Sequence, residues 1–199
     1  MGMIGNTMLT SNWNNLYGSK QGLLIDDPYY AYIDMATIES SARAAGGASH
    51  GALVSYFGRL NYDYNNRYML TATFRADGST KFGPNNRFGY FPSFSAGWNI
   101  SNEKFMESVT GIESLKLRAS WGQNGNDKIG DWQYLATVSS GARGYTFNDV
   151  IYAGVSPTKV ANPDLKWETS EQINIGVDAR FMKKFNFVVD YYIKNTKDL

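Results

Sequence analysis

The stretch "RADGSTKFGPNNRFGYFPSFSAGWNIS", residues 75–101, decides the fold that the sequence predicts. A loop rich in glycine and charged residues lies between two runs that alternate between apolar and polar residues. Large aromatic residues occupy even positions of the second run: Phe88, Tyr90, Phe94 and Trp98. Because successive side chains of a strand point to opposite faces, this alternation predicts a long strand with one aromatic and one polar face.

The composition excludes several classes of site. The chain has 199 residues, a net charge of +1, no cysteine and one histidine, His50. A charge this small gives no electrostatic reason to expect nucleic acid as a partner. The absence of cysteine excludes disulfides and thiolate metal sites, and a single histidine excludes a histidine pair. We therefore expect no cofactor, no catalytic or metal site and no enzymatic activity.

Hydropathy alone would indicate a soluble protein. No stretch approaches the roughly 18 consecutive apolar residues of a membrane helix. The N-terminal stretch also lacks the basic region and apolar core of a signal peptide. Membrane β-barrels, however, alternate along every strand, and their average hydropathy is therefore polar as well.

The period-two pattern recurs along residues 53–199. It predicts six strands, at about residues 53–64, 68–77, 87–100, 114–121, 172–181 and 185–194. Short connections are expected at 65–67, 101–111 and 182–184, and long ones at 78–86 and 125–168. Pro92 lies inside the third strand and predicts a local irregularity there, because proline cannot donate to a strand ladder.

Residues 1–52 are expected to be rich in loops. Pro28 follows two aspartates, as at the start of a helix, and a glycine pair further along would end it. We therefore predict a short helix over about residues 28–44. The small residues that follow predict a flexible connection in which His50 is solvated.

Alternation does not say where the apolar face points. A soluble β-sandwich turns it inward onto a second sheet, whereas a membrane barrel turns it outward to lipid, around a polar lumen. Strands of about ten residues, alternating short and long connections, and aromatic residues in two bands favour the barrel. The band beside the short connections comprises Tyr62, Tyr64, Tyr68, Trp98, Phe181 and Phe185. The band toward the long connections comprises Phe74, Phe88, Tyr90, Trp121 and Tyr191.

A barrel wall requires that all strands keep the same parity. The outer face is then expected to comprise Tyr56, Leu60, Leu70, Phe74, Phe94, Trp98, Leu117, Ile175, Val177, Phe187 and Val189. Finding Arg59 or Arg75 on that face would contradict the barrel.

Residues 53–199 resemble the barrel of TonB-dependent outer-membrane transporters of the SusC/RagA-like branch. The resemblance rests on the run from Asp77 to Gly83, on "FPSFSAGW" (residues 91–98), and on "NPDLKWETSEQINIGVD" (residues 162–178), which TonB-dependent receptors share more widely. It implies an all-β fold of antiparallel up-and-down strands, part of a 22-stranded barrel that crosses the outer membrane of a Gram-negative bacterium many times.

The same resemblance implies a function and partners. Members of this family import oligosaccharides or peptides presented by a surface lipoprotein of the SusD type, with energy delivered through TonB. By this comparison the chain is an internal piece with about six strands of an incomplete barrel. The plug and the region that contacts the TonB complex would lie outside it. A soluble carbohydrate-binding β-sandwich, with the aromatics as a stacking platform, is the alternative.

Two sets of residues are candidates for contact with the lumen or the substrate. The charged set lies on or beside polar strand faces and comprises Arg59, Arg75, Asp77, Arg87 and Arg118. The aromatic set lies in the long connection and comprises Trp132, Tyr134, Tyr145 and Tyr152. Because aromatic rings stack on sugars and on peptides, this set does not distinguish the two substrate classes. Neither "DGSTKFGPNN" nor "NGNDKIGD" has the ligand spacing of a calcium loop.

Overall fold

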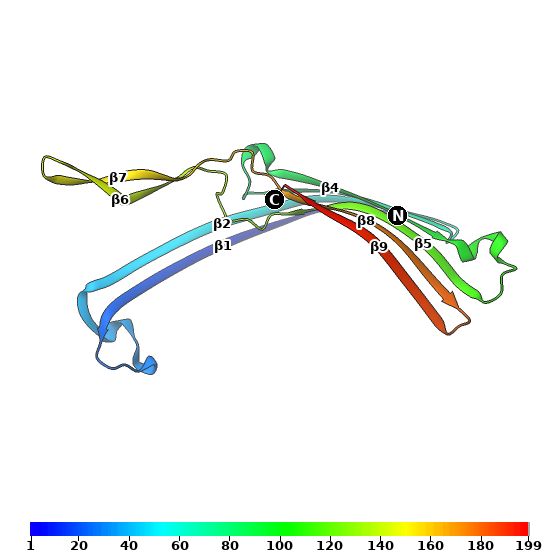
Figure 1. Ribbon diagram of the computed structural model, residues 1–199, viewed down its shortest axis with the longest axis horizontal. Coiled ribbons are helices and arrows are strands. Elements are labelled where there is room, and N and C mark those ends of the chain that lie inside the picture. Colours follow the sequence, from blue (N-terminus) through cyan, green and yellow to red (C-terminus); the bar gives the residue numbers. More distant parts are fainter. Residues whose placement is uncertain (199) are drawn as a thin grey trace. The chain divides into compact units, whose positions relative to one another are not determined.

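The computed structural model describes residues 1–198. In this part of the chain seven strands form one sheet, in the order β1-β2-β3-β4-β5-β8-β9, and β6 and β7 form a second sheet (Figure 1). The strands are β1 (Gly2–Leu23), β2 (Ala36–Tyr64), β3 (Tyr68–Ser79), β4 (Phe88–Asn99), β5 (Ile112–Asn126), β6 (Thr137–Phe147), β7 (Val150–Lys159), β8 (Glu168–Phe181) and β9 (Phe185–Lys197). Short 3-10 helices are η1 (Pro28–Tyr30), η2 (Ile33–Met35), η3 (Pro84–Asn86), η4 (Ile100–Asn102) and η5 (Lys104–Met106).

The chain divides into two compact units, residues 10–52 and residues 1–9 with 53–199. In the first unit, β1 and β2 are hydrogen-bonded neighbours. Side chains add to this pairing: the Gln21 backbone N–H donates to Ser41 Oγ at 2.8 Å, and Thr37 Oγ1 donates to the carbonyl of residue 22 at 3.0 Å.

The helix predicted over residues 28–44 is wrong. Pro28 does begin a 3-10 turn, and the Asp27 carboxylate caps it by accepting from the Tyr29 N–H at 2.9 Å. From Ala36 onward, however, the chain is strand β2. Alanine is the best helix former, but helix propensity is a weak determinant that tertiary context often overrides. Here β1 supplies the hydrogen-bonding partner, so most of this region is strand and not loop.

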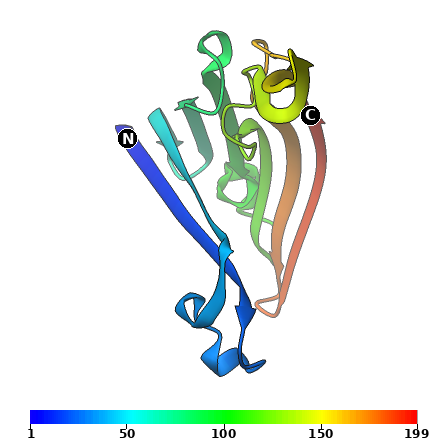
Figure 2. The same ribbon diagram turned by 90° about the vertical axis from the view of Figure 1, so that its left-hand side faces the viewer.

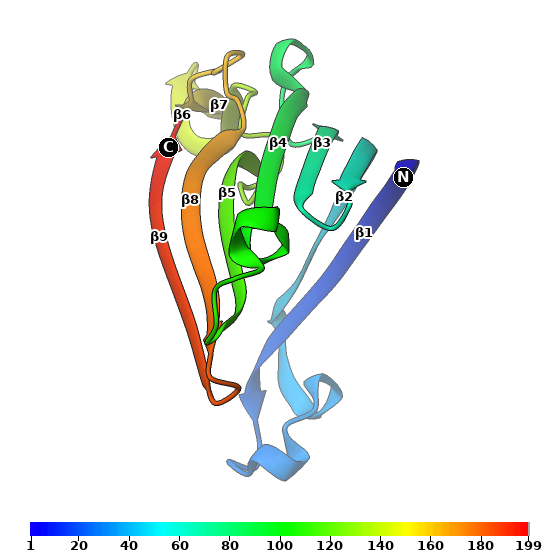
Figure 3. The same ribbon diagram turned by 90° about the vertical axis from the view of Figure 1, so that its right-hand side faces the viewer.

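In the second unit the strands of the large sheet pair antiparallel in chain order, except that the β6–β7 hairpin comes between β5 and β8 in the chain. Figure 2 and Figure 3 show this succession from opposite sides, with β9, β8, β5, β4 and β3 next to one another in that order. The tight turns at Asn65–Asn66 and Met182–Lys183 have positive φ angles of 50–55°. Two-residue hairpin turns favour this conformation, and the short connections predicted at 65–67 and 182–184 are confirmed.

Cross-strand partners share a face of the sheet, so the register assigns the faces directly. One row comprises Leu60, Ala72, Phe94, Trp121, Ile173 and Ile193, and the next comprises Tyr62, Leu70, Ala96, Ala119, Ile175 and Tyr191. The opposite face carries the row Asn61, Thr71, Ser95, Ser120, Asn174 and Tyr192. Arg59 is paired with Thr73, and Arg75 with Phe91, on that polar face. The predicted parity is confirmed.

The apolar face has no second layer over it. Phe94 and Ile175 are 54% and 55% exposed in the middle of the sheet. Among residues 1–139, 144–152 and 154–198 the buried hydrophobic side chains are Ala36, Phe82, Phe91, Trp167 and Ala179. A soluble sandwich would cover its apolar face with a second sheet, whereas a barrel wall presents it to lipid. No helix within the same residues is long and apolar enough to span a membrane.

Two details of the predicted strands differ from the structure. Residues 125–168 contain the hairpin β6–β7, whose turn has Asn148 and Asp149 at φ 54° and 58°, and not only a polar connection. The irregularity expected at Pro92 is absent from the β3–β4 register. The β4–β5 ladder begins one residue later, at Ser93, so the missing proline N–H removes no bond from that ladder.

Candidate functional site

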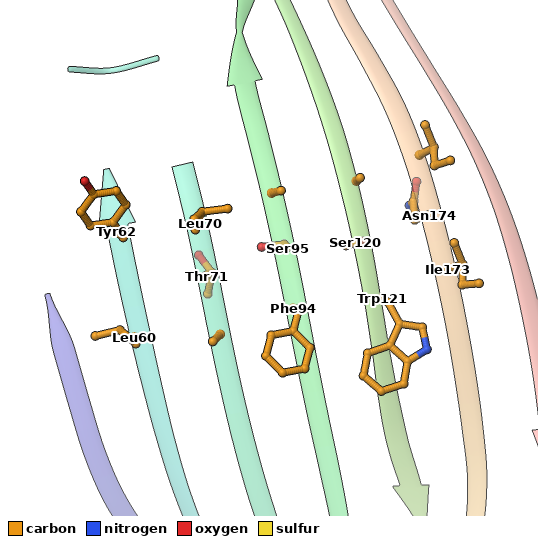
Figure 4. A pocket seen from close by; sticks show the side chains of 14 residues that line it. Leu60, Tyr62, Leu70, Thr71, Phe94, Ser95, Ser120, Trp121, Ile173 and Asn174 are labelled. Atoms are coloured by element: carbon orange, nitrogen blue, oxygen red, sulfur yellow. The ribbon is translucent and has the colours of Figure 1, made fainter. Parts of the chain in front are cut away.

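The apolar face contains a shallow depression of about 600 Å³. Figure 4 shows Phe94 and Trp121 side by side from neighbouring strands, with Leu60, Leu70 and Ile173 around them. The two aromatic rings stack with centroids 6.0 Å apart and planes 13° apart. This wall has almost no polar surface, so it suits contact with hydrocarbon and offers no group for chemistry.

At the short-turn end of the same face, Tyr64, Tyr68 and Trp98 form a row that we call the turn-end ladder. Their successive ring centroids are 6.5 Å and 6.4 Å apart. Glu103, in the turn after β4, accepts hydrogen bonds from Tyr68 Oη at 2.7 Å and from Trp98 Nε1 at 3.0 Å. The Tyr68 bond, and then the Trp98 bond, lower the pKa of Glu103. The aromatic edge of the apolar face is therefore tied to the turn.

The polar face carries an ion-pair network that joins three strands. Arg118 on β5 binds Asp178 through Nε and Nη2, at 2.9 Å and 2.8 Å. Its Nη2 also lies 3.0 Å from Asp190 Oδ1 on β9. Arg118, Gly176 and Asp190 occupy one cross-strand row, so the guanidinium group passes over Gly176. A Cβ at that glycine would overlap Asp190 and lie 2.8 Å from Arg118 Nη2, so the absence of a side chain makes the network possible.

Arg75 and Asp77 form a second pair, on β3. Arg75 Nε donates to both oxygens of Asp77 at 2.8 Å and 2.7 Å, and Arg75 Nη2 donates to Ser55 Oγ at 3.0 Å. Asp77 is 7% exposed, and a buried carboxylate needs such a partner. Arg59 is apart from this pair and donates to Thr73 Oγ1 at 3.2 Å.

Arg87 has a different role, through its backbone. Its carbonyl oxygen accepts hydrogen bonds from the Ser79 N–H at 3.1 Å and from Trp167 Nε1 at 3.2 Å. The candidate charged residues therefore do not converge on one site. Arg75 and Asp77 pair with each other, whereas Arg59 and Arg118 bind other partners on the polar face.

Phe82, Phe91 and Trp167 form the hydrophobic core of the second unit, which we call the rim cluster. Phe82 and Trp167 stack with centroids 5.0 Å apart, and Phe91 meets Trp167 edge-on at 5.5 Å. A neighbouring cavity of about 390 Å³ is lined by Phe91 and Trp167 and by Arg75, Asp77, Asn124 and Asp127, with Leu53 and Gly125. The cavity joins apolar walls to donor and acceptor groups.

The four candidate aromatics of the long connection form two pairs. Trp132 and Tyr134 are tilted against each other with centroids 6.4 Å apart, and Tyr145 and Tyr152 stack across the β6–β7 hairpin at 5.5 Å. Trp132 is half exposed and has a φ of 58°, which is rare for a bulky residue. Trp132 in the first pair and both rings of the second pair are exposed.

Sequence reasoning missed the residues that organise this end of the sheet. Phe91 occupies an odd position in β4, where the pattern predicts a polar residue, and that exception was the available signal. Trp167 lies in the stretch 162–178 that carries the family resemblance, but the sequence pattern predicts no role for it. Asp127, Glu103 and Gly176 carry no pattern by which one sequence could single them out.

Within residues 1–198 there is no group of three or more histidine, cysteine, aspartate or glutamate side chains that could hold a metal ion. Of the charged groups described above, Arg75 pairs with Asp77, and Arg118 pairs with Asp178 and Asp190.

Comparison with known proteins is consistent with this geometry. The family model "TonB dependent receptor-like, beta-barrel" matches residues 2–199. TonB-dependent receptor P39 of Formosa agariphila is 42% identical over 153 residues, covering 76% of this chain and 14% of the relative. TonB-dependent receptor SusC of Bacteroides thetaiotaomicron is 42% identical over 156 residues, covering 76% of this chain and 16% of SusC.

A solved structure is similar over the whole chain. The structure of the RagAB peptide importer in the "closed-closed" state has a TM-score of 0.82 and 27% identity, covering 100% of this chain and 21% of that chain. The chain thus spans about a fifth or less of the proteins it matches. It belongs to the TonB-dependent receptor β-barrel family, a family of outer-membrane receptors and not of enzymes, within its SusC/RagA-like branch.

Proposed function

We propose that the complete protein imports oligosaccharides or peptides across the outer membrane of a Gram-negative bacterium. A SusD-like surface lipoprotein would present the substrate, and the TonB complex would deliver energy through a region outside this chain. The observation that carries the proposal is the separation of an apolar face from a mainly polar face. The same six strands place apolar side chains on one side and mainly hydroxyl, amide and charged groups on the other, where Phe57, Phe91 and Val188 are exceptions.

The polar face suits the passage of a hydrated solute. Its mid-sheet row contains Thr71, Ser95, Ser120 and Asn174, which both donate and accept hydrogen bonds. The charges of Arg75 and Arg118 are compensated by neighbouring carboxylates. A wall of this kind presents weak, exchangeable contacts, and a transported solute must be able to leave each of them.

The exposed aromatic pairs support a role in substrate contact. Trp132 with Tyr134, and Tyr145 with Tyr152, present flat apolar surface beside polar backbone. Such surfaces fit the apolar face of a sugar ring or the side chains of a peptide. RagAB, which this chain resembles in structure, is a peptide importer, and we keep peptides beside oligosaccharides for this protein.

Uptake by intact cells tests the proposal. A strain that lacks the complete gene would be complemented with wild type, with Trp132→Ala/Tyr134→Ala, or with Phe94→Leu as a control on the lipid face. Labelled oligosaccharides and peptides would be offered with and without functional TonB and the lipoprotein. We expect TonB-dependent uptake of one class, reduced by the double variant and retained by the control.

Two results would contradict the proposal. One is that uptake of both substrate classes is the same with and without the protein. The other is that the complete protein folds in plain buffer without lipid or detergent, which is the behaviour of the soluble sandwich.

A further inference from the structure

Loop 80–87 and the long connection 127–167 meet at the rim cluster. Phe82 comes from the loop, Phe91 from β4, and Trp167 from the last residue before β8. Phe82 is completely buried although it belongs to a loop between two strands, and connecting segments usually lie on the surface. Ile129 and Leu165, one near each end of the long connection, pack against the same cluster.

Polar contacts tie the same two segments together. Asp127, at the start of the long connection, accepts from Ser79 Oγ through its carboxylate at 3.1 Å and from Lys81 Nζ through its carbonyl at 3.0 Å. At the other end, Trp167 donates to the Arg87 carbonyl at 3.2 Å. Both ends of the long connection are therefore bound to the loop by hydrogen bonds as well as by packing.

Two glycines leave the space that the Phe91 ring occupies. A Cβ added to Gly125 would overlap the Phe91 ring. A Cβ at Gly89 would lie 2.5 Å from the same ring and 3.0 Å from Trp167 Cγ. The rim cluster thus depends on the backbone of β4 and β5 as closely as on its own side chains. Interiors packed this tightly respond to the addition of a single methyl group.

Two further contacts hold the ends of the long connection together beyond the cluster. The Asn162 N–H donates to the Tyr134 carbonyl at 3.2 Å, and the Tyr134 ring lies 3.3 Å from the Cβ position of Gly83 in the loop. Farther out, the β6–β7 ladder begins with Thr137 opposite Lys159. The exposed aromatic pairs of the candidate ligand surface are thus carried on a segment whose base is held at the loop.

We propose that the rim cluster and Asp127 form a rim anchor, which fixes both roots of segment 128–166 to loop 80–87 and so sets the position of its aromatic surface before a ligand arrives. The inference deepens the proposed function, since it concerns how the same surface is kept ready. If the anchor opens, only a fraction of molecules presents the surface correctly, and the apparent affinity falls by that fraction.

Hydrogen exchange in the complete receptor, folded in detergent or bilayers without ligand, tests the anchor. The variants are Phe82→Ala, which removes the buried ring; Trp167→Phe, which keeps a ring but loses the bond to Arg87; and Gly125→Ala, which intrudes on Phe91. We expect amides of residues 128–136 and 160–166 to exchange about tenfold faster or more in Phe82→Ala and Gly125→Ala, through local opening. Trp167→Phe should show a smaller increase.

Trp132→Ala is the matched control, because it removes an exposed ring from the same segment without touching the cluster. Its exchange should match wild type, and mid-strand amides of β3, β4, β5 and β8 should be unchanged in every variant. If Phe82→Ala does not fold, Phe82→Leu keeps most of the volume and should still accelerate exchange in the segment.

Unchanged exchange in residues 128–136 and 160–166 would overturn the anchor. Equal acceleration in the strands would overturn it too, because the cluster would then be an ordinary part of barrel stability. Since no ligand is present, this result is independent of the uptake test, and either proposal can fail without the other.

Discussion

The two ends of the sheet hold their aromatic residues in different ways. In the turn-end ladder the rings lie on the outer face, are about half exposed at Tyr64 and Tyr68, and are tied to the turn by Glu103. In the rim cluster the rings lie away from that face, contact one another and are buried. The turn-end ladder depends mainly on the environment of the outer face, whereas the rim cluster depends on contacts with specific side chains.

The difference teaches which substitutions each region tolerates. An outward ring in lipid needs only to be apolar and at the right depth, with an anchor for its polar edge near the interface. An inward ring needs a partner of matching shape, because the space around it is already filled. The loss of stability from a substitution on the outer face should therefore depend on its depth in the membrane and on the polarity of the new side chain. On the inner face it should depend on the contacts that the substitution removes or blocks.

The largest expected effect tests the outer half of this comparison. Phe94→Arg places a charge in the middle of the apolar face and should destabilise the complete barrel by about 2–4 kcal/mol, whereas a charge near either interface should cost about 0–1 kcal/mol. Ser95→Arg, one residue along, points to the polar face and is the control. Denaturant titration of the barrel folded in bilayers measures the effect. Equal losses from the two variants would contradict the assignment of faces.

The next largest effect tests the packing on the inner, polar face. Gly176→Ala should destabilise by about 1–3 kcal/mol, because the methyl group would displace Arg118 from Asp190. Gly97→Ala, on the other side of Arg118, is the matched control. Its nearest neighbours are the flexible tips of Lys116 and Met69 at 3.3 Å and 3.4 Å, so a change within about 0.5 kcal/mol is expected. Equal losses of stability from Gly176→Ala and Gly97→Ala in the same bilayer titration would contradict a stabilising role for the Arg118 network.

The smallest effect concerns the turn-end ladder and its pH dependence. The pKa of Glu103 is lowered from its ordinary value of 4.5 by the Tyr68 and Trp98 hydrogen bonds. The carboxylate therefore stabilises the fold above pH 4.5, and the contribution is lost as the pH falls through the lowered pKa. Glu103→Gln should lower the melting temperature slightly at pH 7. It should leave the melting temperature unchanged at a pH below the lowered pKa of Glu103.

Glu107→Gln, in the same turn, provides the control for the pH measurement. It should leave the melting temperature unchanged at both pH values. A Glu103→Gln difference that persists unchanged at low pH would mean that the charge of Glu103 plays no part in holding the ladder.

The strands from residue 53 onward were predictable because their signal is repeated. Alternation continues for many residues in each strand, and one inverted register would expose every apolar side chain of that strand to the wrong side. Tight turns such as Asn65–Asn66 add an independent local signal. The apolar surface and the polar face could therefore be assigned residue by residue.

The parts that failed depend on partners distant in the sequence. Residues 36–44 become strand because β1 lies beside them, and local helix propensity does not contain that fact. The rim cluster joins residues about 80 positions apart, and the exception to alternation at Phe91 is explained by its packing in this cluster. The candidate charged residues were placed on the correct face, but their partners could not be inferred from spacing.

Water accessibility along β4 tests the central claim most directly. The chain has no cysteine, so single cysteines can be introduced at residues 93, 94, 95 and 96 of the complete protein, with any others outside this chain replaced. In bilayers, a water-soluble maleimide should label Ser93→Cys and Ser95→Cys, while Phe94→Cys and Ala96→Cys should react only with a lipid-soluble reagent. Labelling of all four positions from water, or the inverse pattern, would contradict a wall with lipid on its aromatic side.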